Sequence, residues 1–363
     1  MATSAEAPVR LCCYLETEVI GGMEVSVATL LANLDPQYDV TVLGVSEPVV
    51  AFVADERPGI ATRVLSPVRH KSNIRAIASH VRAMHELKPD LLLVSLSQLY
   101  DAQYALLAAV LNRVPTYAVV HCVLPSASRS QNLIFRALSR GVRAFGGVSR
   151  SVCADTEARL GLPSGSVALL YNGVAVTGWS GAVPPAHDGP PGRLVVGAVG
   201  RLVPEKGFDV LIHAMVELAD AELVLMGDGP ARAELEDLAR RLGVRDRITF
   251  TGWVEPPWAV RQRCDVLAVP SRVEGFGLVA VEGLLAGIPV VASRVGGLPE
   301  VIEDGVTGLL VEPGDSGSLA RALGVLAADA VLRSDLAERG RAEAGRRFSV
   351  PAMAAAYAGF LAD

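Results

Sequence analysis

The feature that most constrains the fold of this chain is an alternation of short apolar runs with longer amphipathic stretches, which occurs in two series. Short apolar runs predict buried strands, and the amphipathic stretches predict helices. The strands expected are residues 9–15, 40–45, 91–94, 116–120, 194–199, 222–226, 248–251, 266–269 and 289–292. The helices expected are residues 22–34, 73–87, 101–112, 131–142, 209–218, 232–242, 319–328 and 331–344. Strands that alternate with helices predict parallel sheets covered by helices.

A stretch rich in glycine and proline separates the two series. Residues 173–193 read GVAVTGWSGAVPPAHDGPPGR and contain few periodic apolar positions. Because glycine and proline favour turns and loops, this stretch is the best candidate for a linker. The 363 residues are also enough for about two domains. We therefore predict a Rossmann-like domain over residues 1–175, a linker over 176–193 and a second Rossmann-like domain over 194–349.

Composition excludes several classes of protein. Hydrophobic residues make up 51% of the chain and charged residues 20%, which argues against a disordered chain. The net charge of −6 argues against a dedicated nucleic-acid binder. The five cysteines form no C-x-x-C pair, which argues against a disulfide framework or a zinc site and favours a reduced, cytoplasmic protein. We expect neither a signal peptide nor a membrane span, because no long apolar run is present.

One segment of the first half contains no acidic residue at all, from Ala102 to Ala154. Within it, Arg136, Arg140 and Arg143 have the spacing of one helix face. Such a face fits peripheral contact with a membrane surface or binding of an anionic acceptor. An ordinary solvated helix face fits the pattern as well, and the sequence leaves these alternatives open.

The richest motif is PSRVEGFGLVAVE, residues 270–282, which follows an expected strand and leads into an apolar helix. A glycine-rich turn before a helix offers backbone N–H groups and the positive end of the helix dipole to an anion. Glu274 and Glu282 flank this turn. They would repel a ligand that was only phosphate, but carboxylates accept hydrogen bonds from hydroxyl groups. The motif therefore favours a ligand that carries a sugar and a ribose.

Two cations occupy a loop that follows the strand expected at 194–199. The loop reads GRLVPEKG and holds Arg201 and Lys206. Ligands of open α/β sheets bind at the C-terminal ends of the strands. Fixed cations at that position suit a diphosphate leaving group, because charge builds on its oxygens as the bond breaks. A further loop, GDGP at 227–230, also follows a strand.

The first half offers weaker signals. The turn Gly21-Gly22 follows the first strand, and it either approaches a ligand or only joins a strand tightly to a helix. His121 follows the strand at 116–120 and is either a site residue or a structural histidine. The sequence has no D-x-D metal clamp, no P-loop and no G-x-S-x-G motif, which argues against a P-loop NTPase and an α/β-hydrolase.

Taken together, these loops resemble those of retaining glycosyltransferases of family 4, which have the GT-B fold. In that fold two Rossmann-like α/β domains face each other across a deep cleft. The resemblance extends over residues 194–315 and includes the E-x7-E pattern at Glu274 and Glu282. In the first half it rests on Gly21-Gly22, His121, Gly147-Val-Ser149 and Tyr171-Asn-Gly-Val174. The sequence departs from the family where Ala175 follows Asn-Gly-Val, a position often occupied by Asp.

The resemblance implies a role for each matching residue. Arg201 and Lys206 would hold the donor diphosphate, Glu274 would contact hydroxyls of the donor sugar, and His121 would lie beside that sugar. These four form the implied catalytic set. The implied donor-binding residues are Gly21, Gly22, Gly200, Gly227, Thr251, Val254, Gly275, Phe276, Gly277, Leu278 and Glu282, the last of which would bind the ribose. Residues 350–363 would form a helix that crosses back to the first domain.

The reaction implied is transfer of a sugar from a nucleoside-diphosphate sugar to an acceptor hydroxyl, on one face and with retention. It would need neither a metal nor another cofactor. A UDP-sugar is favoured over a GDP-sugar, and the acceptor would be a natural product, a cyclitol, or a lipid-linked or polysaccharide glycan. We name Ser97, Gln98, Tyr100 and Arg129 as candidate acceptor contacts. The implied location is cytoplasmic, either free or peripheral at the inner membrane face.

Other functions remain open for such a sequence. A sugar-nucleotide epimerase of the same fold, or a nucleotide-sugar-binding module without catalysis, would share these motifs. A phosphorylase would need a lysine for pyridoxal phosphate, and only Lys71, Lys88 and Lys206 are present. A dehydrogenase is least favoured, because neither half carries the dinucleotide-binding fingerprint.

Overall fold

The computed structural model describes residues 7–68, 73–124, 129–175, 193–253 and 264–362, without the side chains of 129–131. The chain divides into two compact units. One comprises residues 1–173 together with 350–363, and the other comprises residues 174–349. The first unit ends at residue 173, two residues before the end expected at 175. The linker expected at 176–193 lies almost wholly outside the described residues.

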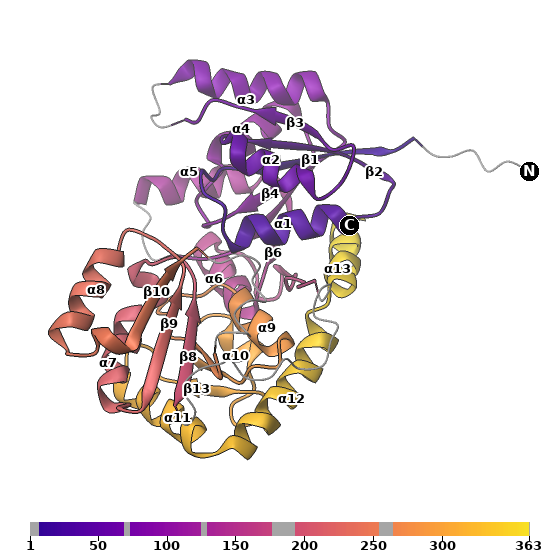
Figure 1. Cartoon of the computed structure of the whole chain (residues 1–363). Coiled ribbons are helices and arrows are strands. Elements are labelled where there is room, and N and C mark those ends of the chain that lie inside the picture. Colours follow the sequence, from indigo (N-terminus) through magenta and orange to yellow (C-terminus); the bar gives the residue numbers. More distant parts are fainter. Residues whose placement is uncertain (1–6, 69–72, 125–128, 176–192, 254–263, 363) are drawn as a thin grey trace, which may run out of the picture. The chain divides into compact units, whose positions relative to one another are not determined.

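The first unit is a seven-stranded parallel sheet in the order β3-β2-β1-β4-β5-β6-β7 (Figure 1). Its strands are β1 (Val9–Leu15), β2 (Tyr38–Gly44), β3 (Ala61–Val64), β4 (Leu91–Leu96), β5 (Thr116–Val120), β6 (Val142–Gly147) and β7 (Ala168–Leu169). Its helices are α1 (Gly22–Asn33), α2 (Glu47–Asp55), α3 (Ile74–Leu87), α4 (Gln103–Asn112), α5 (Arg129–Ser139), α6 (Arg150–Leu160) and α13 (Val350–Ala362). Helix α1 packs against α2 and α13, and α3 packs against α4, so helices cover both faces of the sheet.

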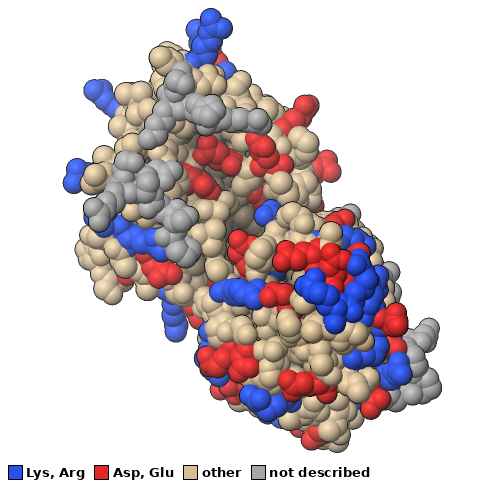
Figure 2. Space-filling view, turned by 90° about the vertical axis from the view of Figure 1, so that its left-hand side faces the viewer, with Lys and Arg blue, Asp and Glu red and all other residues tan. Residues whose placement is uncertain are grey.

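The second unit is a six-stranded parallel sheet in the order β10-β9-β8-β11-β12-β13. Its strands are β8 (Leu194–Val199), β9 (Ala221–Met226), β10 (Ile248–Gly252), β11 (Val266–Val269), β12 (Val290–Ser293) and β13 (Leu309–Val311). Its α-helices are α7 (Phe208–Glu217), α8 (Arg232–Arg241), α9 (Leu278–Leu285), α10 (Leu298–Val301), α11 (Ser316–Ala328) and α12 (Ala330–Arg347), and its 3-10 turns are η1 (Pro204–Lys206) and η2 (Arg245–Arg247). Acidic and basic side chains are interspersed on the face of this unit that Figure 2 shows.

Buried apolar side chains explain why the central strands form where they do. Residues 11–15 of β1 are at most 1% exposed, and every residue of β5 and β11 is buried. A strand covered by helices on both faces has no polar face, so it reads as a continuous apolar run. In both units all strands are parallel, so the loops at their C-terminal ends gather along one edge of the sheet.

The helix expected at 131–142 is wrong at its C-terminal end. Helix α5 ends at Ser139, and Val142 already begins β6, where it pairs with Thr116. The chain turns at Gly141, where an added Cβ would lie 2.5 Å from Cγ2 of Val110. Arg136, Arg140 and Arg143 therefore do not share one helix face, because Arg143 lies in the strand. No helix among the described residues is long and apolar enough to span a membrane.

Candidate functional site

The second unit brings Lys206 and Glu274 together. Lys206 Nζ donates a hydrogen bond to Glu274 Oε2 at 2.8 Å, and Ser271 Oγ donates to the same oxygen at 3.0 Å. Lys206 ends the η1 turn after β8, and Glu274 lies in the loop after β11, the neighbouring strand. Both side chains are partly exposed, at 28% and 14%. The pair is therefore formed before any ligand binds and still presents a cation and a carboxylate to solvent.

An arginine missed in the sequence analysis joins these two loops. Arg272 makes two hydrogen bonds of 2.6 Å to the carboxylate of Asp209, and its Nη1 also donates to the carbonyl of Pro204 at 2.9 Å. The Arg272 backbone N–H donates to the carbonyl of Glu205 at 2.7 Å. Arg272 holds the pKa of Asp209 below its usual range, because it stabilises the ionised carboxylate. The forked contact fixes the η1 turn that carries Lys206.

Backbone contacts at two glycines set the path of these loops. Gly207 has a φ of +67°, and a Cβ there would lie 2.1 Å from the carbonyl oxygen of Pro270. Gly296 has a φ of +55°, and a Cβ there would lie 1.7 Å from the carbonyl oxygen of Glu274. Only glycine permits both the positive φ and such an approach of one backbone to another. The loop that carries Glu274 is thus packed between two glycine-containing turns.

Helix α9 starts at Leu278, directly after this loop, with Gly277 at its N-cap in a left-handed conformation. The first N–H groups of a helix have no partner within the helix and can bind an anion. Phe276 contributes its backbone only, because its buried ring packs edge-on against Phe348 with 5.3 Å between ring centroids. Gly275, between Glu274 and Phe276, is buried as well.

Glu282 lies within α9 and is half-buried. Burial raises the pKa of its carboxyl group to about 7. Its carboxyl group has no hydrogen-bond or ion-pair partner among the residues that the structure describes. A half-buried carboxyl group without a partner is placed to bind hydroxyl groups of a ligand.

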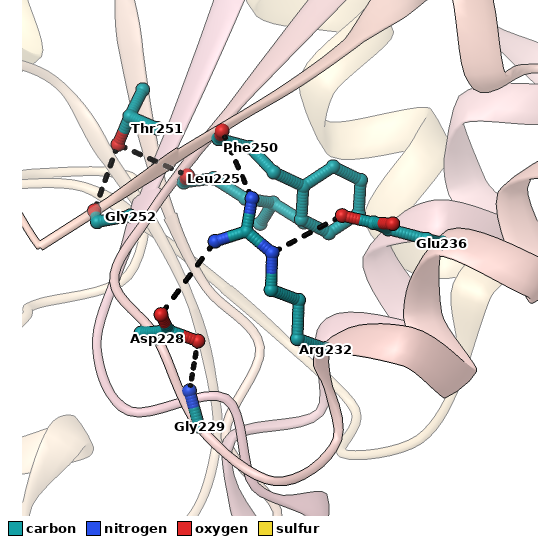
Figure 3. Close-up of polar contacts among 8 residues, drawn as sticks. All are labelled: Leu225, Asp228, Gly229, Arg232, Glu236, Phe250, Thr251 and Gly252. Atoms are coloured by element: carbon teal, nitrogen blue, oxygen red, sulfur yellow. Dashed lines mark hydrogen bonds and ion pairs between the residues drawn. The ribbon is translucent and has the colours of Figure 1, made fainter.

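The C-terminal ends of β8, β9 and β10 also meet at this sheet edge. Figure 3 shows those of β9 and β10 with the loop after β9. A Cβ at Gly227 would lie 2.0 Å from the carbonyl oxygen of Gly200, so these two loops touch through their backbones. The Gly227 N–H donates to the carbonyl of Gly252 at 2.8 Å, and the hydroxyl of Thr251 points at the same carbonyl at 3.0 Å. Arg201, which follows Gly200, is exposed.

A second arginine missed in the sequence analysis lies beside these loops. The Arg232 guanidinium bonds Glu236 at 3.1 Å and lies 3.7 Å from a carboxylate oxygen of Asp228 (Figure 3). Its carbon Cζ lies 5.8 Å from the centre of the Phe250 ring. No local motif marks this residue, because the strand and the loop that it contacts come from separate parts of the chain. Val254, the other donor-site residue expected here, lies outside the described residues.

In the first unit, the turn at Gly21 and Gly22 is exposed and begins α1. The carboxylate of Glu24 fixes this turn. Its Oε2 accepts a hydrogen bond from the Gly21 N–H at 2.9 Å, and its Oε1 accepts one from Thr17 Oγ1 at 2.5 Å. The carboxylate of Glu24 thus caps the N-terminus of α1 by binding the Gly21 N–H, while the backbone of the two glycines stays exposed.

The acceptor candidates Ser97 and Gln98 are engaged locally by an aspartate that sequence reasoning missed. Asp101 Oδ2 accepts hydrogen bonds from Ser97 Oγ at 2.5 Å and from the Gln98 N–H at 2.8 Å. Next to it, the carboxylate of Glu16 accepts a hydrogen bond from the N–H of Ala102. Burial raises the pKa of Asp101, and burial together with the nearby Asp101 raises the pKa of Glu16 to about 7. The sheet edge therefore holds two neighbouring, partly buried carboxyl groups.

His121 directly follows β5 and is 8% exposed. Its N–H donates to the carbonyl of Leu96 at 2.9 Å, which places it beside the loop that starts with Ser97. The ring nitrogen Nε2 is buried and has no hydrogen-bond partner in the structure. Burial lowers the pKa of the imidazole to about 4, so it is neutral at pH 7. An unsatisfied buried nitrogen is costly, and a ligand hydroxyl could satisfy it.

The expected site residues thus fall into two groups. The second unit holds Gly200, Arg201, Lys206, Gly227, Thr251, Glu274, Gly275, Phe276, Gly277, Leu278 and Glu282 along one sheet edge. The first unit holds Gly21, Gly22, Ser97, Gln98, Tyr100 and His121 in loops after β1, β4 and β5. The side chain of Arg129 lies outside the described part. The described residues contain no group of three His, Cys, Asp or Glu side chains placed to hold a metal ion.

Both halves of the chain are similar to known protein families. Residues 184–343 match the family model described as glycosyl transferases group 1, and residues 20–177 match the model of glycosyltransferase family 4. The crystal structure of Anabaena HepE in complex with UDP and glucose superposes with a TM-score of 0.84, over 98% of this chain and 100% of HepE. The two sequences are 24% identical. The chain therefore has the GT-B fold, and each of its halves is similar to a glycosyltransferase family model.

Curated relatives of this GT-B chain match over part of their length. The lipopolysaccharide core biosynthesis glycosyltransferase LpsE of Rhizobium meliloti is 39% identical over 176 residues, which are 48% of this chain and 52% of LpsE. The D-inositol 3-phosphate glycosyltransferase of Mycolicibacterium vanbaalenii is 39% identical over 191 residues, which are 47% of this chain and 41% of that enzyme. The chain thus spans about half the length of the curated relatives it matches.

Proposed function

We propose that the protein transfers a sugar from a nucleoside-diphosphate sugar to a hydroxyl group of an acceptor, with retention at the anomeric carbon. The observation that carries this proposal is the preformed pair of Lys206 and Glu274, 2.8 Å apart. The pair lies at the sheet edge where the α9 N-terminus offers backbone N–H groups. A cation suits the diphosphate and a carboxylate suits sugar hydroxyls, so the pair matches the two halves of such a donor.

Each further side chain at this edge has a role in the proposed complex. Arg201 and Lys206 bind the diphosphate and stabilise the negative charge that develops on it as the glycosidic bond breaks. Glu282 accepts hydrogen bonds from the ribose hydroxyls. In the other unit, the unpartnered Nε2 of neutral His121 forms a hydrogen bond with a hydroxyl of the donor sugar. The exposed turn at Gly21 and Gly22 admits the diphosphate close to its backbone.

The proposed chemistry takes place on one face of the sugar. The acceptor oxygen forms a bond to the anomeric carbon as the bond to the diphosphate breaks, and the departing phosphate oxygen takes the acceptor proton. We propose that no metal ion takes part, because the cations of the loop after β8 supply the charge that a metal would supply. The UDP in the HepE complex supports uracil as the base, ahead of guanine. The acceptor is proposed to be a natural product, a cyclitol, or a lipid-linked or polysaccharide glycan, and the location cytoplasmic.

Nucleotide binding provides the first test of this proposal. Melting temperatures are measured with UDP, GDP, ADP and dTDP and their common sugars, each with and without EDTA. A ligand at 100 times its Kd stabilises the folded state by about 2.7 kcal/mol, which is readily seen as a shift. We expect UDP and UDP-sugars to give the largest shift, unchanged by EDTA. No shift with any nucleotide would contradict the proposal, and a shift that EDTA abolishes would contradict its metal-independent part.

Product configuration provides the second test. Without an acceptor, water can take the place of the acceptor hydroxyl, and the anomer of the released sugar is read by proton NMR before mutarotation. The proposal expects the anomer with the configuration of the donor. Release of the opposite anomer would contradict retention, and appearance of a new sugar nucleotide would indicate an epimerase.

A further inference from the structure

A cavity of about 430 Å³ opens on the surface of the first unit, and none of the residues that line it is one assigned above to the donor. It is lined by Tyr100, Asn132, Leu133, Arg136 and Arg159. Tyr100 comes from the loop after β4, Arg159 from the last turn of α6, and the other three from α5. Cavities of this size commonly hold small ligands such as a monosaccharide derivative.

The cavity gathers positive charge without a matching acid. Neither Arg136 nor Arg159 forms an ion pair with a carboxylate among the described residues. Arg136 directs Nε and Nη2 at the carbonyl of Arg159, at 2.9 and 2.7 Å, and so binds the C-terminal end of α6. The carboxylate nearest in sequence to Tyr100 is that of Asp101, which binds Ser97 and Gln98. Two like charges that line one cavity repel each other, and an anion between them would remove that cost.

The remaining lining groups fit a phosphate ester better than a bare ion. Asn132 and Tyr100 line the cavity, and their side chains carry an amide and a hydroxyl, which form hydrogen bonds with phosphate or sugar oxygens. The Tyr100 ring is held edge-on against the buried ring of Phe135, with 5.5 Å between centroids, so its orientation is fixed by packing. Leu133 is 70% exposed and gives the cavity an apolar wall. Guanidinium groups bind phosphate oxygens through paired, charge-assisted hydrogen bonds.

We infer that this cavity binds the phosphate group of a phosphorylated acceptor. The inference rests on the proposed glycosyl transfer, because it assigns the ligand to the acceptor side of that reaction. The shared chemistry is a phosphate ester, carried either by a water-soluble sugar or polyol or by a lipid headgroup. Arg159 supplies a guanidinium group that has no other partner among the described residues. Arg136 binds the carbonyl of Arg159 through Nε and Nη2, which leaves its Nη1 group for the phosphate.

The test compares two arginines that differ in their relation to the cavity. Inorganic phosphate and glucose 6-phosphate, with glucose as the unphosphorylated control, are titrated calorimetrically into the full chain at constant ionic strength. Saturating UDP is present throughout, so that the phosphate probes do not occupy the donor site. Arg159→Gln removes a cavity cation and keeps the backbone carbonyl that Arg136 binds. Arg140→Gln makes the same charge change at an exposed position outside the cavity lining.

We expect both phosphate probes to bind the wild-type chain and glucose to bind at least tenfold more weakly. Arg159→Gln should weaken phosphate binding about tenfold, as loss of a charged hydrogen-bonding group predicts, and Arg140→Gln less than twofold. Equal weakening by both variants would overturn the inference, because it would show a diffuse surface charge. A wild-type chain that binds UDP but neither phosphate probe would overturn it too, while the proposed function would stand.

A second arm identifies the carrier of the phosphate. Vesicles of phosphatidylcholine alone, and of phosphatidylcholine with phosphatidylglycerol, are sedimented with the wild-type chain and both variants. Binding to the anionic vesicles that Arg159→Gln abolishes and Arg140→Gln spares would assign the cavity to a lipid headgroup. Sensitivity to Arg159→Gln with the soluble probes alone would assign it to a water-soluble acceptor. Vesicle binding that both variants reduce equally would show general attraction to a charged surface and would contradict a headgroup in the cavity.

Discussion

The two sheet edges use their charged side chains in opposite ways. In the 174–349 unit, Lys206 and Glu274 form a partly exposed ion pair, and Arg272 secures the loop around it. In the other unit, the carboxyl groups of Glu16 and Asp101 are neighbours without an ion-pair partner among the described residues, and burial raises the pKa of each. An edge with fixed charges is prepared for a charged diphosphate. An edge with buried carboxyl groups, of which Glu16 has a pKa of about 7, suits hydroxyl groups, which both accept and donate.

The largest expected effect concerns the glycine that packs against the Glu274 loop. Gly296→Ala places a Cβ within 1.7 Å of the Glu274 carbonyl oxygen, a contact that no side-chain motion can relieve. We expect a loss of about 4 kcal/mol in the free energy of unfolding, measured with urea. Gly314→Ala is the matched control, because its φ of +80° is equally left-handed and a Cβ there meets no atom within 4 Å. It should cost about 1 kcal/mol, and equal losses would show that the contact does not matter.

The next effect sharpens the contrast at the other edge. The carboxyl group of Glu16 has a pKa of about 7 in the folded chain, raised above its usual value, so the folded state binds the proton more tightly than the unfolded state. Its contribution to stability is present at low pH and is lost as pH rises toward 7. Relative to wild type, Glu16→Gln should therefore gain about 1 kcal/mol of stability per pH unit between pH 5 and 7. Parallel stability curves for the two proteins would contradict the raised pKa.

A smaller effect links protonation to nucleotide binding in the 174–349 unit. Burial raises the pKa of Glu282 to about 7, and the ionised form accepts ribose hydroxyls better. The ionised fraction rises about tenfold from pH 6 to pH 8, so UDP affinity should rise about tenfold over that range. In Glu282→Gln, the UDP affinity should change with pH only as far as UDP itself titrates. An unchanged pH dependence in the variant would show that Glu282 does not bind the nucleotide.

Much of the fold follows from the sequence, and the failures have physical causes. The strands at 9–15, 116–120, 194–199 and 266–269 match their predicted bounds because each is a mainly apolar run, most of which the fold buries on both faces; in β1 only Val9 and Arg10 are not buried. The short edge strands β3, β7 and β13 carry no comparable signal, because runs of two to four residues are too short to show a periodicity. The helix expected at 131–142 was extended too far because the apolar residue Val142 continues its pattern into a strand.

The site divides in the same way. Lys206 and Glu274 could be predicted together because each follows a strand within a recognisable loop, and the two strands prove to be neighbours. The glycines of these loops are required because one backbone approaches another there, as at Gly207 and Gly296. Arg272 was missed because tertiary packing brings its partner Asp209 to it from 63 residues away. Arg232 was missed because its contact with the Phe250 ring also depends on tertiary packing, although its carboxylate partners Asp228 and Glu236 are local. Glu16 and Asp101 were missed because they become a pair only when β1 and β4 lie side by side.

Binding of UDP to a lysine variant tests the central claim most directly. Lys206→Ala is compared by calorimetry with wild type and with Lys88→Ala, an exposed lysine of the other unit that makes the same charge change. Loss of the cation beside the diphosphate should weaken UDP binding by about 10- to 100-fold, and Lys88→Ala should leave it within twofold of wild type. Unaltered UDP affinity in Lys206→Ala would contradict the claim that the edge with the Lys206–Glu274 pair binds the nucleotide diphosphate.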